Sequence, residues 1–222
     1  GGGHIDDEFK RQFKQLAGGG LHQIVCIPTA DNDEKLDNFQ APITHVPEDP
    51  LLGIPTTYLH TRDIRVSDSD FFVDPLRRAN GVFFHGGRQP RLADAYLNTA
   101  THRELTNLLN RGGVIAGSSA GATILGSFMV RNQGAPDFNP DVMVDQGYPT
   151  EGFGFIKGIA IDQHVTQRNR ESHLGEVLQL HSELLGIGID EDTAIILHGN
   201  IFEVIGSGKV FIRDGTSPYF TM

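Results

Sequence analysis

Short apolar runs alternate with amphipathic segments along this chain, and this alternation limits the folds open to it more than any other feature. The runs have the length and continuous apolar character of strands buried on both faces of a parallel sheet. They are Gln23–Thr29, Gly81–His85, Val114–Gly117 and Gly158–Asp162. The segments expected to be helical are Asp6–Ala17, Pro75–Ala79, Asp94–Arg111 and Leu174–Leu185. Strands that alternate with helices predict an α/β fold, with a mostly parallel sheet covered by helices on both faces.

Two regions depart from this alternation. Residues Ala30–Pro55 are polar and rich in proline, which predicts an irregular excursion over the surface. From Ile187 onward short β runs alternate with turns, and the run IFEVIGSGKVFI predicts a hairpin about Ser207 and Gly208. We therefore expect residues 1–222 to form one α/β domain that ends in an antiparallel hairpin.

The composition of the chain excludes several classes of binding partner. The chain has 222 residues and is 38% hydrophobic, which is enough for a buried core and a substrate cleft. No stretch approaches the ~18–20 apolar residues that a membrane span needs. A formal net charge of −10 argues against nucleic acid or an anionic membrane as the partner. The only cysteine, Cys26, excludes an internal disulfide and a Cys-rich zinc site, and its apolar neighbours predict a core position.

The chain begins GGGHID, without a methionine or a leader sequence. We interpret its first three glycines as the loop after a strand, and expect an N-terminal strand to precede Gly1. They do not fit the spacing of a dinucleotide-binding loop, and that alternative is weak. The expected location is the cytoplasm, with secretion or a periplasmic location left open.

The segment Gly117-Ser118-Ser119-Ala120-Gly121 fits the nucleophile-elbow pattern G-x-S-x-G. A strand precedes it, and the segment SSAGATILG into which that strand runs looks helical, as the motif requires. Ser119 is flanked symmetrically by glycines, so it is a better nucleophile candidate than Ser118. The N–H of Ala120 would be an oxyanion donor. The alternative is a Gly/Ser-rich turn that binds phosphate or only packs tightly.

A nucleophilic serine needs a base and an orienting carboxylate. His164 follows a predicted strand, which places it at the same sheet edge as Ser119. Asp190, Glu191 and Asp192 follow another short strand, and the pattern alone does not choose among them. A rival triad in α/β-hydrolase order would combine Ser119 and Asp190 or Asp192 with His198. Gly86 and Gly87 end the strand GVFFH, where the backbone can approach a substrate carbonyl as a second oxyanion donor.

Six stretches of the chain carry a resemblance to a known family: GGGHID, IPTA, FFHGGRQ, GVIAGSSAGA, IDQH with QRNR, and GIGIDEDTA. Taken together, they resemble the cyanophycinase branch of the serine peptidases, which also contains aspartyl dipeptidase. They follow the family's order from residue 1 to about residue 195. The resemblance implies a flavodoxin-like fold similar to that of class I glutamine amidotransferases. It also implies a homodimer, and neither a metal nor an organic cofactor.

The resemblance assigns roles residue by residue. It makes Ser119 the nucleophile, His164 the general base and Glu191 its carboxylate partner. The backbone N–H groups of Gly87 and Ala120 would form the oxyanion hole. The positions that match the family's substrate pocket are Gln89, Asp162, Gln163, Arg168 and Arg170. The implied substrate is a β-aspartyl linkage, in a dipeptide such as β-Asp-Arg or in the polymer cyanophycin, whose carboxylates arginines would pair.

Three departures from the family pattern leave the substrate open. His173 stands where the family usually has arginine, Arg88 replaces the asparagine of a GGNQ-type loop, and Ala30–Pro55 matches poorly. The alternatives are an α-aspartyl dipeptidase or another serine hydrolase on the same fold, and a catalytically silent binding or sensor protein.

Overall fold

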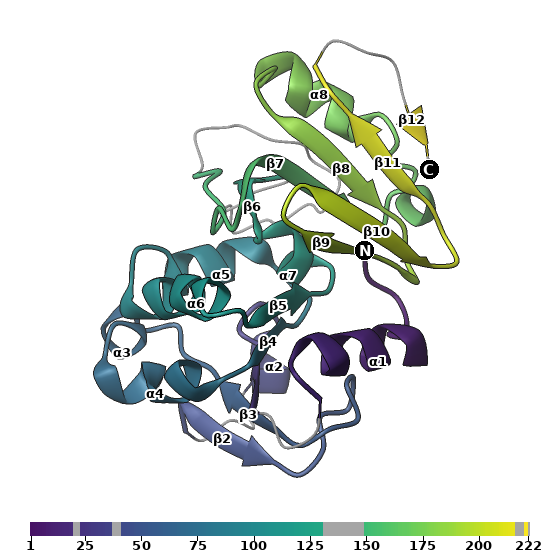
Figure 1. The fold of residues 1–222 in the computed structure, drawn as a ribbon. Coiled ribbons are helices and arrows are strands. Elements are labelled where there is room, and N and C mark those ends of the chain that lie inside the picture. The colour runs from purple at the N-terminus through teal and green to yellow at the C-terminus, as the bar shows by residue number, and fades with distance from the viewer. Residues whose placement is uncertain (20–22, 37–40, 131–148, 216–219, 222) are drawn as a thin grey trace. The chain divides into compact units, whose positions relative to one another are not determined.

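The structure is a computed structural model that describes residues 1–19, 23–36, 41–130, 149–215 and 220–221. These residues form two compact units. One is Lys10–Gly121, and the other combines Gly1–Phe9 with Ala122–Met222. Each unit is described below by itself (Figure 1).

The unit Lys10–Gly121 is built on a five-stranded sheet in the order β2-β3-β1-β4-β5. Four strands are parallel to their neighbours, and the edge strand β2 pairs with β3 in the antiparallel sense. The strands are β1 (Ile24–Ile27), β2 (Ile43–Val46), β3 (Thr56–Leu59), β4 (Gly81–Phe84) and β5 (Val114–Gly117). Every residue of β1 and β4 is buried, as their continuous apolar sequence predicts.

Helices cover this sheet on both sides. Figure 1 shows α3 to α6 on one side and α1 on the other. On the α1 side, Phe13 makes an edge contact with Phe83 of β4 at 6.1 Å between ring centroids. The helices are α1 (Asp7–Leu16), α2 (Asp33–Leu36), α3 (Ile64–Ser67), α4 (Asp70–Arg78), α5 (Gln89–Tyr96), α6 (Ala100–Asn110) and α7 (Ala120–Thr123).

Two helix predictions in this unit were wrong in their bounds. The segment Asp94–Arg111 is two helices, because the chain turns through Asn98, whose φ is +60°. Asparagine tolerates this left-handed conformation better than most residues, and a residue in it ends a helix. Helix α4 begins before Pro75, because the Ser69 hydroxyl accepts the Phe72 N–H at 3.3 Å and caps an earlier start. The excursion Ala30–Pro55 contains the unpredicted α2 and β2.

The second unit has a five-stranded sheet in the order β12-β11-β8-β7-β6. Strands β6, β7 and β8 are parallel, and β11 and β12 continue the sheet in the antiparallel sense. Helix α8 packs on one face through Leu174 and Val177. The elements are β6 (Gly126–Met129), β7 (Ile156–Gln163), the 3₁₀-helix η1 (Thr166–Arg168), α8 (His173–Leu180), β8 (Leu185–Ile189), β11 (Val210–Arg213) and β12 (Phe220–Thr221).

A separate two-stranded antiparallel sheet joins β9 (Thr193–His198) to β10 (Ile201–Gly206). The C-terminal hairpin is therefore present, but it turns between His198 and Ile201, and its predicted position about Ser207 and Gly208 was wrong. Strands β10 and β11 do not pair with each other, because β11 pairs with β8. The turn between β10 and β11 instead contacts the start of β9, since the Gly208 N–H donates to Thr193 Oγ1 at 2.8 Å.

The predicted fold class is confirmed: the chain is α/β, with parallel-dominated sheets, helices and a small antiparallel sheet. That it forms one domain stays a prediction. Within the ranges described above, no helix is long and apolar enough to cross a membrane.

Candidate active site

The turn between β5 and α7 holds Ser119 in an unusual backbone conformation. Its φ is +53°, in the left-handed region that non-glycine residues occupy only when the surrounding structure enforces it. Ser118, directly after β5, still bonds to the neighbouring strand, because its N–H donates to the Phe84 carbonyl of β4 at 3.0 Å. The geometry thus separates the two serines, and Ser119 is the one at the strained strand-to-helix turn where a nucleophile elbow places its residue.

Glycines allow close backbone contacts around Ser119. A side chain at Gly121 would collide with the Phe84 carbonyl, so glycine lets α7 pack against β4. A Cβ added at Gly86 would lie 3.1 Å from Ser119 Cβ and 3.7 Å from its Oγ. The loop Gly86-Gly87 after β4 therefore lies beside the serine, as the sequence predicted from the shared sheet edge. Gly87, at φ +140°, has no room for a side chain against the Ala30 carbonyl.

The other unit brings His164 and Glu191 into contact. Strands β7 and β8 are parallel, with Gln163 opposite Ile189, so the residues that follow each strand leave the sheet at the same edge. His164 Nδ1 lies 2.6 Å from Glu191 Oε1. His164 is only 6% exposed and, like Ser119, has a left-handed φ, here +55°.

The environment of His164 favours its neutral form. Burial is the largest cause, and the nearby Arg168 charge adds to it; together they outweigh Glu191 and lower the pKa of His164 to about 4. Since a carboxylate can only accept, the neutral imidazole must carry its proton on Nδ1 and donate it to Glu191. Nε2 is then left with a lone pair, as a general base requires.

The two neighbouring acids are engaged differently. Asp190 is buried and accepts the Thr166 N–H at 2.8 Å, the Thr166 hydroxyl at 2.9 Å and the Lys209 N–H at 3.1 Å. Asp192 Oδ1 accepts the His4 N–H at 2.7 Å. Of the three consecutive acids, Glu191 is therefore the one in contact with His164. The structure supplies a choice that the sequence pattern alone left open.

Sequence reasoning missed the role of the N-terminal glycines. Gly2, at φ +137°, lies against the His164 ring so closely that a side chain there would collide with Cε1. A Cβ added at Gly3 would lie 2.6 Å from Asp192 Oδ1. The segment Gly1–Gly3 thus packs on the His164–Glu191 pair. Its glycines were a signal of close backbone approach, but the sequence does not show what they approach.

The predicted substrate-pocket residues divide by exposure. Arg88, at the start of α5, and Arg168, in η1, are exposed, and His173 at the start of α8 is half-buried. Arg170 is only 2% exposed, and its Nη1 donates to the Gln163 carbonyl at 3.3 Å. The remaining positions, Gln89, Asp162 and Gln163, are also buried. Of the two arginines in QRNR, only Arg168 presents its charge to solvent.

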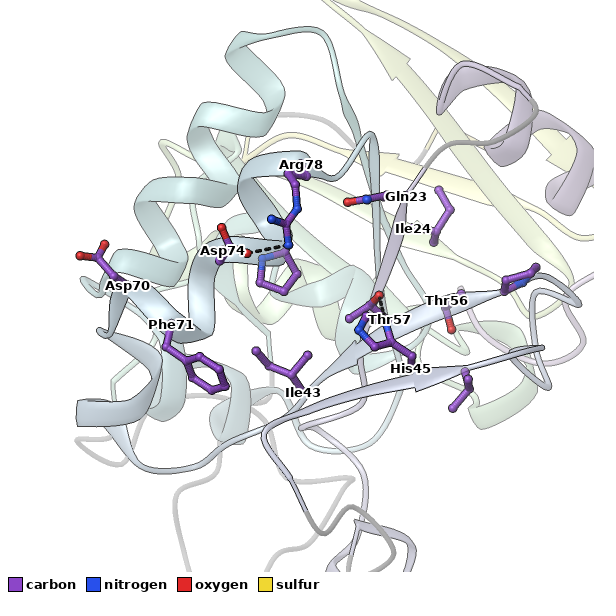
Figure 2. A pocket seen from close by; sticks show the side chains of 13 residues that line it. Gln23, Ile24, Ile43, His45, Thr56, Thr57, Asp70, Phe71, Asp74 and Arg78 are labelled. Carbon is purple, nitrogen blue, oxygen red and sulfur yellow. Dashed lines mark hydrogen bonds and ion pairs between the residues drawn. The ribbon is translucent and has the colours of Figure 1, made fainter.

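One pocket of about 850 Å³ lies elsewhere in the unit Lys10–Gly121. Figure 2 shows it between β2, β3 and α4. Two pairs of its polar side chains are in contact: Arg78 with Asp74 at 2.6 Å and His45 with Thr57 at 2.8 Å. Its lining contains none of the predicted site residues. It comprises Gln23, Ile24, Ile43, His45, Val46, Pro55, Thr56, Thr57, Asp70, Phe71, Asp74, Pro75 and Arg78.

Known proteins resemble this chain in sequence and in fold. The model of Peptidase family S51 matches residues 1–205. A cyanophycinase of Geminocystis herdmanii is 31% identical over 219 residues, covering 96% of this chain and 77% of the relative. A cyanophycinase of Nostoc sp. is 37% identical over 212 residues, covering 94% and 69%.

Two solved structures show the same fold. A peptidase from an acI-B1 actinobacterium superposes with a TM-score of 0.72 at 24% identity, covering 97% of this chain and 87% of that one. A putative peptidase E from Listeria monocytogenes has a TM-score of 0.59 at 14% identity, covering 90% and 93%.

The α/β fold and the serine-bearing elbow, together with these relatives, define a serine-type peptidase. The chain belongs to peptidase family S51.

Proposed function

We propose that this peptidase hydrolyses β-aspartyl (isopeptide) linkages such as β-Asp-Arg, through an acyl-enzyme on Ser119. His164 is the general base and Glu191 its carboxylate partner. The observation that carries the proposal is the 2.6 Å contact between His164 Nδ1 and Glu191 Oε1, which leaves Nε2 free of its proton. The left-handed Ser119 supports it independently. The proposal requires Ser119 Oγ and His164 Nε2 to come within hydrogen-bonding reach in the working enzyme.

The reaction proceeds in two steps. Ser119 Oγ attacks the β-carbonyl carbon of the aspartyl residue while its proton passes to His164 Nε2. The tetrahedral intermediate collapses when His164 gives that proton to the leaving amine, which breaks the C–N bond and leaves an ester on Ser119. Water then attacks the ester by the same route and restores the serine.

Backbone N–H groups of Gly87 and Ala120 are proposed to stabilise the oxyanion in both steps. Ala120 is the first residue of α7, where an N–H has no acceptor within the helix. Gly87 belongs to the loop beside Ser119, and its positive φ sets the direction of that loop's peptide groups. A donor aimed at a developing oxyanion contributes about 3–4 kcal/mol to transition-state stabilisation in comparable sites.

Substrate selection is proposed to rest on exposed cations. A β-Asp-Arg unit presents carboxylates, which arginine pairs with in bidentate geometry, and Arg168 and Arg88 are exposed. The two relatives described above are both named cyanophycinase. His173 would border the same pocket. Gln89, Asp162, Gln163 and Arg170, which are buried, are proposed as further substrate-pocket residues on the family resemblance alone.

The test is hydrolysis of β-Asp-Arg and of cyanophycin beside an α-Asp-Arg control. We expect cleavage of the β-linked material only, and none by Ser119→Ala. Cleavage of the α-linked peptide instead would replace the proposed substrate by an α-aspartyl one. Labelling of Ser119 by a fluorophosphonate probe without cleavage of any of the three would retain the nucleophile and refute the β-aspartyl substrate.

A homodimer is proposed alongside this function, on the family resemblance alone. Light scattering coupled to size-exclusion chromatography should give twice the chain mass of 24.3 kDa. A mass of one chain across the micromolar range would refute it.

A further inference from the structure

A second group of reactive side chains lies on the α1 side of the sheet in the unit Lys10–Gly121. In the sheet register, Cys26 of β1 stands beside Tyr58 of β3 and Phe83 of β4. His85 follows Phe83 by two residues, which places it on the same face. Asp49 reaches this face from the loop before β3. The sulfur of Cys26, a carboxylate oxygen of Asp49 and a ring nitrogen of His85 all lie within 4.8 Å of one another.

The three side chains are held in place and shielded from water. Cys26 and Asp49 are 0% exposed and His85 is 8% exposed. The N–H groups of Leu51 and Leu52 donate to Asp49 Oδ1 at 2.9 and 2.7 Å. Tyr58 donates its hydroxyl to Asp49 Oδ2, which therefore faces the cluster.

The cluster contains polar atoms that the described residues satisfy poorly. His85 Nε2 lies 3.3 Å from Asp49 Oδ2, but no group among the residues described here is aligned to hydrogen-bond with it. Thr56 Oγ1, from the strand beside Cys26, is likewise buried, and its contact with the Cys26 thiol does not have the geometry of a full hydrogen bond. A buried polar atom without a partner costs about 1–3 kcal/mol. Two such atoms at one cluster favour a bound ion that would satisfy them better than the residues described here.

We propose that Cys26, Asp49 and His85 bind one Zn²⁺ ion. Thiolate, imidazole and carboxylate are the three ligand types that zinc takes in proteins, whereas Ca²⁺ and Mg²⁺ take oxygen ligands. A thiolate and a carboxylate balance the charge of a divalent cation, so the ion can be buried without net charge. Three protein ligands leave the fourth tetrahedral position to a water molecule, which the Thr56 hydroxyl can hydrogen-bond.

The location gives this ion a structural effect. His85 is followed directly by the loop Gly86-Gly87, which lies beside Ser119. Zinc would fix His85, the residue directly before that loop, to β1 and to the segment before β3. The proposal is independent of the catalytic assignment, because none of its three ligands belongs to the proposed triad or to the oxyanion donors.

Cobalt is the sharpest probe, because Cys26 is the only cysteine in the chain. Chelator-treated protein, with any histidine tag removed, is titrated with Co²⁺. We expect one equivalent per chain, a thiolate-to-cobalt charge-transfer band, loss of that band on adding Zn²⁺, and a higher Tm with Zn²⁺. Only Cys26 can give that band.

Variants locate the site. Cys26→Ser should remove the charge-transfer band, and His85→Gln should abolish stoichiometric uptake. His45→Gln is the matched control, because His45 lies in the same unit outside the cluster, on β2; it should bind like the wild type. The wild-type result stands even if a variant fails to fold. Folded, chelator-treated wild-type protein that shows no thiolate band at saturating Co²⁺ would overturn the proposal.

Discussion

The acid limit of catalysis tests the electrostatics of His164 most directly. An ordinary histidine has a pKa of 6.5, whereas burial and the Arg168 charge lower that of His164 to about 4. At pH 5.5 a base of pKa 4 is almost fully deprotonated, whereas one of pKa 6.5 is deprotonated in only about a tenth of molecules. We therefore expect kcat/KM on β-Asp-Arg at pH 5.5 to remain near its plateau, about tenfold above the value for an unperturbed histidine.

Two substitutions should move the acid limit in opposite directions. Arg168→Gln removes a charge that lowers the pKa of His164, so the limit should rise toward pH 6.5. Glu191→Gln removes the charge that raises it, so the limit should fall while kcat drops, because the imidazole loses the group that orients it. The variants are compared by the pH of their acid limit and not by the size of kcat/KM, because Arg168 also belongs to the proposed substrate pocket. Lys157→Gln, exposed at the opposite end of β7, is the control.

The same shift has a consequence for stability. Because the pKa of His164 is lower in the folded state, the unfolded chain binds more protons between pH 6.5 and about 4. Above pH 6.5 the lowered pKa of His164 costs the folded state nothing. As the pH falls from 6.5 toward 4, the free energy of unfolding decreases by about 3 kcal/mol on account of His164. Urea unfolding of the wild type and His164→Gln at pH 7 and pH 4.5 isolates it. An acid limit of the wild type near pH 6.5, or a loss of stability equal in the two proteins, would refute this account of His164.

Three further predictions concern individual residues. Ser119→Ala should abolish turnover and probe labelling, whereas Ser118→Ala should retain part of both; the reverse would move the nucleophile to Ser118. Gly2→Ala should reduce kcat about 100-fold with circular dichroism unchanged, because the added methyl displaces the His164 ring; an unchanged kcat would show that the ring tolerates the shift. Asp190→Ala should cost about 2–4 kcal/mol in urea unfolding, because three hydrogen bonds are lost. A cost below about 0.5 kcal/mol would contradict that role.

Local patterns predicted much of this molecule. Continuous apolar runs located β1 and β4, because a strand buried on both faces needs apolar residues at every position. The same signal found β5, whose residues are half-buried, and the buried second half of β7. The glycines flanking Ser119 predicted a strained turn, and the structure has one. His164 was selected by its place after a strand, and its contact with Glu191 depends on the parallel pairing of β7 with β8.

Contacts between distant segments escaped prediction. Nothing near Gly2 in the sequence shows that it packs on His164, and Cys26, Asp49 and His85 are brought together only by the sheet register and one loop. The hairpin error has the same origin. The sequence about Ser207 is a reasonable turn, but strand partners are chosen by side-chain burial, and Val210 is buried against β8.

The left-handed backbone at Ser119 and at His164 sets stability against activity at the same two positions. A non-glycine residue held in this region costs of order 1–3 kcal/mol, and glycine would relieve most of that cost. A library sorted for thermal resistance alone should therefore accumulate glycine at both positions and yield hardier, inactive proteins. Any stabilised version of this peptidase that keeps its activity therefore has to gain its stability at other residues.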